Sequence, residues 1–171
     1  MVSFTKRNQV PLVGILWHDN ILEKCFVTYS EVDPKPEEIT QTIEHIVEEH
    51  YFISKEIKLV LIFNNILAGM GILNLPILEK RWNTPIIIIS EKMPDNTKIL
   101  DVIKNLEHFN HYKETLKLNP TDWIQIEDSR LFMLPIGITE HEAKKIITSL
   151  QVTGDLPEPL RVADVIAKAI H

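Results

Sequence analysis

Two apolar runs, Ile57-Lys-Leu-Val-Leu-Ile-Phe63 and Pro85-Ile-Ile-Ile-Ile89, decide the fold of this sequence. Neither run alternates between polar and apolar residues, and short runs of this kind are typical of strands buried on both faces of a sheet. The segment between them, residues 72–82, has the length and apolar content of a crossover helix, although Pro76 can break its first part. The pattern therefore predicts an α/β domain with two buried strands at its centre.

Further elements are expected on both sides of this pair. Residues 12–17 and 21–29 read as strands of a hairpin, because the Asp19-Asn20 turn between them tolerates positive φ. Thr139-Glu-His-Glu142 is a capping box that opens a helix. The other predicted elements are helices at residues 33–50 and 97–107 and from about residue 159, and strands at 123–126 and 130–134. This order predicts a mixed β-sheet with flanking helices in a single domain over residues 1–171.

Composition narrows the class of protein. The 171 residues are 44% hydrophobic and 25% charged, as in ordinary globular domains. No apolar run approaches the ~20 residues of a membrane span and the start does not resemble a signal peptide, so we expect no membrane association and a cytoplasmic location. The single cysteine, Cys25, excludes an intrachain disulfide and is expected to be a buried, inert thiol. The net charge of −6 disfavours a dedicated nucleic-acid binder.

Local motifs for catalysis are weak in this sequence. Ala68-Gly-Met-Gly71 lacks the third glycine of a dinucleotide fingerprint and the Gly-Lys-Ser/Thr of a P-loop. We therefore interpret it as a tight turn with a glycine at a close backbone approach. His45 and His50 do not share one helix face as zinc-protease histidines do, and His108 and His111 lack a fixed third ligand.

The most specific segment is Leu156-Pro-Glu-Pro-Leu-Arg-Val-Ala163. Its local features are those of a well-capped terminal helix, with Pro159 suited to the first turn and Glu158 at the positive helix end, one turn before Arg161. The segment also resembles the ending of an archaeal family of unknown function, catalogued as domain of unknown function 99. Residues 134–147, 59–69 and 13–16 resemble the penultimate helix, the central strand and the early hairpin of the same family.

That family is similar in turn to endonuclease V, which has a ribonuclease-H-like fold and cuts deaminated nucleic acid with magnesium. The resemblance implies an endonuclease-V-like fold that lacks its first strand, because the family's first-strand Asp has no counterpart here. The family's Asp-Gly pair falls on Phe63-Asn64 or, with a shift of one residue, on Asn64-Asn65. Neither supplies a carboxylate, and neutral Asn amides bind divalent ions weakly. Asp164 alone remains in the last motif as a candidate catalytic residue and metal ligand.

Our first hypothesis is a catalytically degenerate member that binds a protein or nucleic-acid partner and needs no cofactor. Its candidate binding residues are Glu158, Arg161, Asn64 and Asn65. Fold analogy does not restore an activity once its site is lost. Lys144, Lys145, Arg161 and Lys168 form only a sparse basic set near the end of the chain.

Two alternatives remain open. One is a magnesium-dependent endonuclease with a shifted ligand set drawn from Asp33, Glu37 or Glu38, and Asp164. The other is a small-molecule site near Asn64, Asn65 and Ser90, where open α/β sheets place their ligands.

A sheet without its first strand exposes an edge. We expect an association to cover that edge, whether by residues 1–10, by a second copy in a homodimer, or by a strand from a protein partner.

Overall fold

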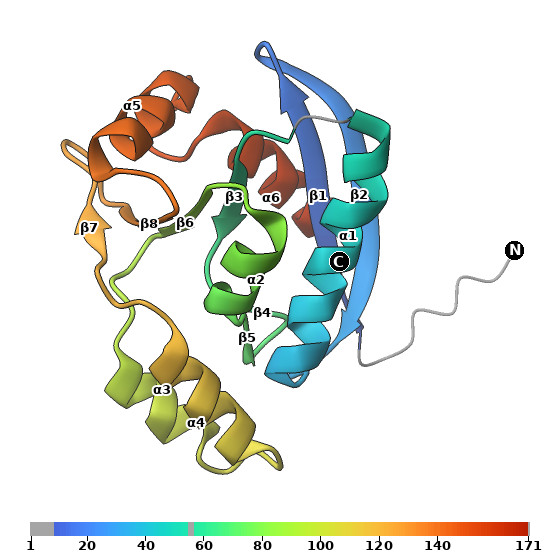
Figure 1. The fold of residues 1–171 in the computed structure, drawn as a ribbon, viewed down its shortest axis with the longest axis vertical. Helices are drawn as coiled ribbons and strands as arrows, with labels where there is room; N and C mark the ends of the chain where they lie inside the picture. The colour runs from blue at the N-terminus through green and yellow to red at the C-terminus, as the bar shows by residue number, and fades with distance from the viewer. Residues whose placement is uncertain (1–8, 55–56, 171) are drawn as a thin grey trace, which may run out of the picture.

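The computed structural model describes residues 9–54 and 57–170 (Figure 1). The strands are β1 (Gln9–His18), β2 (Ile21–Glu31), β3 (Val60–Phe63), β4 (Ile66–Leu67), β5 (Gly71–Ile72), β6 (Ile86–Ser90), β7 (Ile124–Gln125) and β8 (Phe132–Ile136). The helices are α1 (Pro36–Ser54), α2 (Leu75–Trp82), α3 (Asn96–Ile103), α4 (Phe109–Leu118), α5 (Glu140–Leu150) and α6 (Glu158–Ile170). None of these helices is long and apolar enough to cross a membrane.

The two apolar runs form the strands β3 and β6 of a four-stranded mixed sheet with the order β3-β6-β8-β7, in which β6 is an inner strand and β3 lies at the edge. The expectation of burial on both faces is confirmed for β6 but was wrong for β3, where only Ile62 is buried, because an edge strand lacks one neighbour. β3 and β6 are parallel, with Val60 opposite Ile86, and β8 pairs antiparallel with β6. Ile86 to Ile89 are all fully buried, which fits a strand with a neighbour on each side and helices on both faces. The prediction of a mixed sheet with flanking helices is confirmed.

Helices cover the sheet on both faces (Figure 1). On one face α1 and α2 pack on the sheet through a cluster that includes Ile39, Leu75, Leu78, Ile62, Ile86 and Ile88. On the other face α5 and α6 pack through a cluster that includes Ala143, Ile147, Leu160, Ile87, Ile89 and Met133. Successive residues of β6 thus enter opposite clusters, as the two-residue period of a strand requires.

β1 and β2 form the predicted hairpin, joined by Asp19 and Asn20 with φ of 48° and 61°. The prediction of a buried thiol was wrong, because Cys25 is exposed on β2. Phe26 on β2 lies opposite Gly14 on β1 and shares its face, which packs against Ile46 of α1. Cys25 therefore points to the other face of β2, where Val27 and Tyr29 are also exposed.

The hairpin is a separate two-stranded sheet, because no described strand pairs with β1 other than β2. Both β1 and β3 nevertheless contact α6. The described residues contain no counterpart of the family's first strand, which we expected this chain to lack. Gln9 and Val10 belong to β1 itself, opposite Glu31 and Ser30 of β2, and the earlier residues of the expected 1–10 cover lie outside the described part of the chain.

The predicted crossover helix at 72–82 was wrong in its first part. Gly71 and Ile72 form β5, which pairs with β4 in a small hairpin, and α2 starts only at Leu75. The Asn74 side chain accepts a hydrogen bond from the Ile77 N–H at 3.2 Å and caps the helix, and Pro76 fits in the first turn.

The predicted helix at 97–107 ends earlier, at Ile103, and a further helix, α4, follows it unpredicted. α3 and α4 lie together at one end of the molecule (Figure 1). Their apolar residues Ile103, Tyr112 and Leu116 form a third buried cluster with Ile72 of β5. This long-range contact stabilises α4 and is not visible in the local pattern.

Candidate functional site

The carboxyl ends of the parallel strands β3 and β6 lie at one edge of the sheet, where α/β folds place their sites. Asn64 follows β3 and its N–H donates to the Ile89 carbonyl at 2.8 Å. Its φ of 65° is a left-handed conformation that Asn tolerates better than most residues. The next residue, Asn65, is buried and its carbonyl accepts from Leu73 N–H at 2.9 Å. The two amides thus stand at the turn from the sheet into the β4–β5 hairpin.

Ser90 ends β6 beside this turn. Its hydroxyl donates to the Lys92 carbonyl at 2.7 Å and accepts from the Lys92 N–H at 3.3 Å. The hydroxyl is therefore engaged in a local turn, and 6% of the residue is exposed. Asn65 and Ser90, two of the three residues considered for a small-molecule site, present little surface to a ligand.

Asp164 lies on α6, and its carboxylate is 2.6 Å from the Lys168 ammonium one turn further along the helix. This hydrogen bond, and the charges of Asp164 and Glu91, raise the pKa of Lys168. Glu91 directly follows Ser90 at the carboxyl end of β6, and its charge acts on Lys168 of α6. The cation that Asp164 contacts here is an ammonium group of the same chain.

Glu158 and Arg161 form a two-point ion pair at the start of α6. Arg161 Nε donates to Glu158 Oε2 at 2.8 Å and Nη2 donates to Oε1 at 2.5 Å. Hydrogen bonding to Arg161 lowers the pKa of Glu158 and raises that of Arg161. The pair stabilises the helix end through its geometry. Each partner satisfies the other, which leaves less of either group for a partner molecule.

Asp33 is placed in the loop before α1 and there fixes the Ala68–Gly71 turn. Asp33 Oδ1 accepts from the Met70 N–H at 2.8 Å, and its own N–H donates to the Ala68 carbonyl at 2.8 Å. A Cβ on Gly69, whose φ is 88°, would lie 2.3 Å from that carboxylate oxygen. The interpretation of this segment as a tight turn with a close backbone approach is confirmed.

The two neighbouring acids also have structural partners. Glu38 Oε2 accepts from the Lys35 N–H at 3.0 Å, in the manner of a helix N-terminal cap. Glu37 lies 3.0 Å from Nδ1 of His111 on α4. Partial burial raises the pKa of Glu37, but hydrogen bonding to His111 and to the backbone outweighs this and the net shift is downward.

Asp33 and Glu38 line a surface cavity of about 330 Å³ together with Lys35, His108 and Tyr112. The Tyr112 hydroxyl donates to the carbonyl of Asp33 at 2.7 Å, and burial together with the nearby carboxylates raises its pKa. Within residues 9–54 and 57–170, no three His, Cys, Asp or Glu side chains converge in a way that could hold a metal ion. The candidate ligands Asp33, Glu38 and Asp164 are therefore not part of any such group in the described residues.

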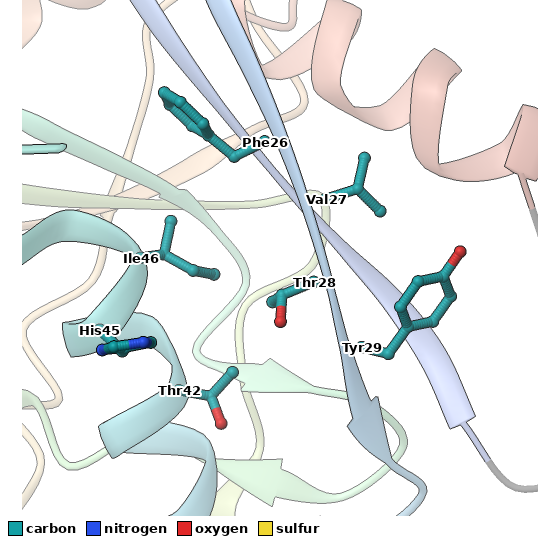
Figure 2. Close-up of a pocket in the computed structure, with 7 residues that line it drawn as sticks. All are labelled: Phe26, Val27, Thr28, Tyr29, Thr42, His45 and Ile46. Atoms are coloured by element: carbon teal, nitrogen blue, oxygen red, sulfur yellow. The ribbon is translucent and has the colours of Figure 1, made fainter. Parts of the chain in front are cut away.

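A larger groove of about 540 Å³ lies between β2 and α1. Figure 2 shows Phe26 and Thr28 pointing from β2 toward Ile46 and Thr42 on α1, whereas Val27 and Tyr29 point away. The lining side chains are apolar and hydroxyl groups together with the imidazole of His45, so the groove offers mainly contact area.

Neither the ion pair between Lys168 and Asp164 nor the effect of Glu91 on the pKa of Lys168 was predicted from the sequence. The i, i+4 spacing of Asp164 and Lys168 was a usable signal for their ion pair. No comparable signal indicated the effect of Glu91 on Lys168, because that effect depends on how α6 packs in the tertiary structure.

Solved structures with the same arrangement of elements define the class of this fold. A protein of unknown function from Archaeoglobus fulgidus superposes with a TM-score of 0.78 at 18% identity, over 96% of this chain and 98% of the other. Ciona intestinalis endonuclease V, bound to an inosine-containing DNA, superposes with a TM-score of 0.54 at 12% identity, over 98% and 87% of the two chains. The fold is therefore that of an endonuclease-V-like protein, which confirms the ribonuclease-H-like fold expected from the resemblance.

The sequence comparisons name the family. The endonuclease dU family matches residues 2–171, and this chain belongs to that family. A UPF0215 protein of Thermococcus kodakarensis is 24% identical over 170 residues, 98% of this chain and 85% of the relative. A UPF0215 protein of Methanosarcina barkeri is 26% identical over 160 residues, 90% and 76% of the two chains. The expected membership of an archaeal family of unknown function is confirmed.

Proposed function

We propose that this chain is a non-cutting member of the endonuclease dU family that acts by binding a macromolecular partner. One observation carries the proposal: a neutral amide, Asn64, stands at the carboxyl end of β3. The pairing of Asp164 with Lys168 supports it. Magnesium-dependent cleavage needs carboxylate oxygens that hold the cation beside the scissile phosphate. A neutral amide and a carboxylate already paired with an ammonium group are poor substitutes.

A protein partner fits the described charges better than a nucleic acid does. Of the basic set near the end of the chain, Lys144 is paired with Glu140 and Glu127, Arg161 with Glu158, and Lys168 with Asp164. Counterion release on nucleic-acid binding requires cationic groups that can contact phosphates, and pairing with carboxylates weakens those contacts. The competing hypothesis is a nucleic-acid partner, and it is supported by the structural similarity to the Ciona endonuclease V, which was solved in complex with DNA.

The decisive experiment measures metal binding and cleavage on the same preparation of the full chain. Calorimetry with MgCl2 and MnCl2 is followed by incubation with DNA and RNA strands that contain deoxyuridine or inosine. We expect neither metal-dependent heat nor cleavage. The matched variants are Asn64→Asp and Asn64→Asp with Lys168→Ala, which restore a carboxylate and release Asp164. A higher manganese affinity in the double variant than in the single variant would support positions 64 and 164 as the former metal-ligand positions.

The second candidate is a magnesium-dependent endonuclease with a shifted ligand set, and the family's description favours it. Asp33, Glu38 and Asp164 are its candidate ligands. Metal-dependent cleavage by the unmodified chain, abolished by Asp164→Asn, would replace the first proposal with this one. The matched control is Asp155→Asn, an acid outside the candidate set that accepts from the Arg130 N–H at 3.3 Å.

A further inference from the structure

β3 has an unpaired edge among the described residues. The Val60 N–H donates to the Pro85 carbonyl at 3.0 Å, and the Asn64 N–H donates to Ile89 at 2.8 Å. Because backbone groups of successive strand residues point to opposite edges, the N–H and C=O groups of Leu61 and Phe63 point away from β6. No described strand pairs with that side. Half-buried backbone groups on an open edge are a template for another strand.

β1 has an unpaired edge of the same kind. Its only partner in the described chain is β2, and none of its ten residues is fully buried. β6 is the contrast, since each of its five residues is buried and both its edges are paired. β1 therefore has the burial of a strand that lacks one neighbour.

The two unpaired edges belong to one part of the molecule. β1 and β3 both contact α6, and Leu12 of β1 and Val60 of β3 pack against the same buried cluster. Figure 1 shows β1 and β3 running in opposite directions beside α6. One added strand can therefore run parallel to β3 and antiparallel to β1, giving the continuous order β2-β1-added strand-β3-β6-β8-β7.

The surroundings define the chemistry of such a strand. β1 and β3 contain no Asp, Glu, Lys or Arg. On one side the face of β1 packs against Ile46 of α1, which lies 3.3 Å from the position of a Cβ on Gly14. On the other side Leu61 and Phe63 face the cluster that contains Leu160 of α6. A strand between these layers would be apolar on both faces, and β1 and β3 offer no lysine or arginine to a phosphate.

We propose that the unpaired edges of β1 and β3 form a strand-acceptor site for an extended, apolar segment of a partner polypeptide. This inference rests on the proposed function, in which the chain acts by binding, and it identifies the partner as a protein. Backbone hydrogen bonds to Leu61 and Phe63 provide affinity, and the apolar layers of α1 and α6 select the side chains.

The probe is a fluorescein-labelled peptide of alternating Val and Ile with a Lys at each end, titrated into the full chain. Anisotropy reports binding, and hydrogen exchange with mass spectrometry reports which amides become protected. We expect saturable binding with new protection at Leu61, Phe63 and β1. The same peptide N-methylated at alternate residues cannot form the backbone bonds on one edge, so its affinity should fall by about tenfold or more.

The matched variants are Leu61→Pro and Leu61→Ala. Both variants remove the leucine side chain, but proline also removes the N–H that points to the unpaired edge and fixes φ, whereas alanine keeps the N–H. Peptide binding should be lost in the first and retained in the second, with both thermal unfolding midpoints recorded. If Leu61→Pro fails to fold, the N-methylated peptide decides instead.

Three results would overturn the proposal. One is equal binding of the N-methylated peptide, which indicates nonspecific apolar adsorption. The second is binding without protection of β1 and β3. The third is full protection of the Leu61 and Phe63 amides from hydrogen exchange in the free chain, because the edge would then already be occupied. The molecular mass in solution identifies the occupant. A dimer indicates a second copy, and a monomer indicates another segment of the same chain. Cleavage of nucleic acid would contradict the proposed function but not this site, so the two failures are distinguishable.

Discussion

β6 and β2 both carry large apolar side chains, yet these side chains differ in exposure. Ile86 to Ile89 of β6 are 0% exposed, whereas Val27 and Tyr29 of β2 are 45% and 50% exposed. β6 has β3 and β8 as neighbours and helices on both faces, whereas β2 pairs only with β1 and has α1 on one face. For the apolar side chains of the two strands, the neighbouring strands and helices determine how much surface is buried and therefore how much stability each side chain contributes.

The largest expected effect comes from shortening one side chain in each strand. Ile88→Ala leaves a cavity in a fully buried cluster and should lower the free energy of unfolding by about 2–5 kcal/mol. Val27→Ala, at a half-exposed position, should lower it by less than about 1 kcal/mol. Urea unfolding followed by circular dichroism measures both. Equal losses would contradict the contrast between the strands.

A smaller effect is expected from the ion pair in the helical layer that covers β6. Glu44 of α1 is buried and contacts Arg81 of α2 at 2.5 Å, while its second oxygen is buried without a partner. Arg81→Met leaves the carboxylate buried and unpaired, and the expected loss is about 1–3 kcal/mol because the arginine itself is half exposed.

Lys104→Met is the matched control, because its pair with Asp101 is exposed and should contribute little. The same urea titration at pH 7 compares the two variants. A loss in Lys104→Met as large as in Arg81→Met would show that burial of the partner acid is not the cause.

The smallest effect concerns the capping box of α5, on the opposite face of the sheet. The Thr139 hydroxyl accepts from the Glu142 N–H at 3.3 Å, and the Thr139 N–H donates to Glu142 at 3.2 Å, so the predicted box is confirmed. Thr139→Ala should cost about 1 kcal/mol in the same unfolding experiment. A larger cost than for Ile88→Ala would mean that the cap, not the core, limits the stability of this face.

The same box predicts a pH dependence. Hydrogen bonds from the Thr139 side chain and backbone lower the pKa of Glu142 below the ordinary 4.5. A carboxyl group whose pKa is lowered in the folded state stabilises the fold fully above its ordinary pKa, and the stabilisation is lost as the pH falls through the lowered value. Unfolding of the parent chain and of Glu142→Gln between pH 7 and pH 3 should therefore converge at the acidic end, and a constant difference would exclude this linkage.

Much of the fold was predictable because it depends on local patterns. The β1–β2 hairpin followed from Asp19-Asn20, the parallel strands β3 and β6 from their apolar runs, and α5 from Thr139 and Glu142. α4 and the β4–β5 hairpin were not predicted, because they depend on packing between Ile72 and Tyr112, which are 40 residues apart. The exposure of Cys25 was misjudged for a similar reason, since one strand does not show which of its faces a helix covers.

The candidate site divides in the same way. The residues and their family resemblance were sufficient to place Asn64 and Asn65 after β3 and to identify Asp164 as a retained acid. Their surroundings could not be predicted. The hydrogen bonds between Asp33 and the Ala68–Gly71 turn link positions more than 30 residues apart, and the charge that acts on Lys168 comes from Glu91, far away in the sequence.

Most helices and strands, and the residues at the carboxyl ends of the strands, thus follow from local sequence, because helix caps, turns and apolar periodicity act over a few residues. That β1 and β3 each have an unpaired edge beside α6 follows from the three-dimensional packing, because backbone pairing between distant segments depends on where α6 holds them.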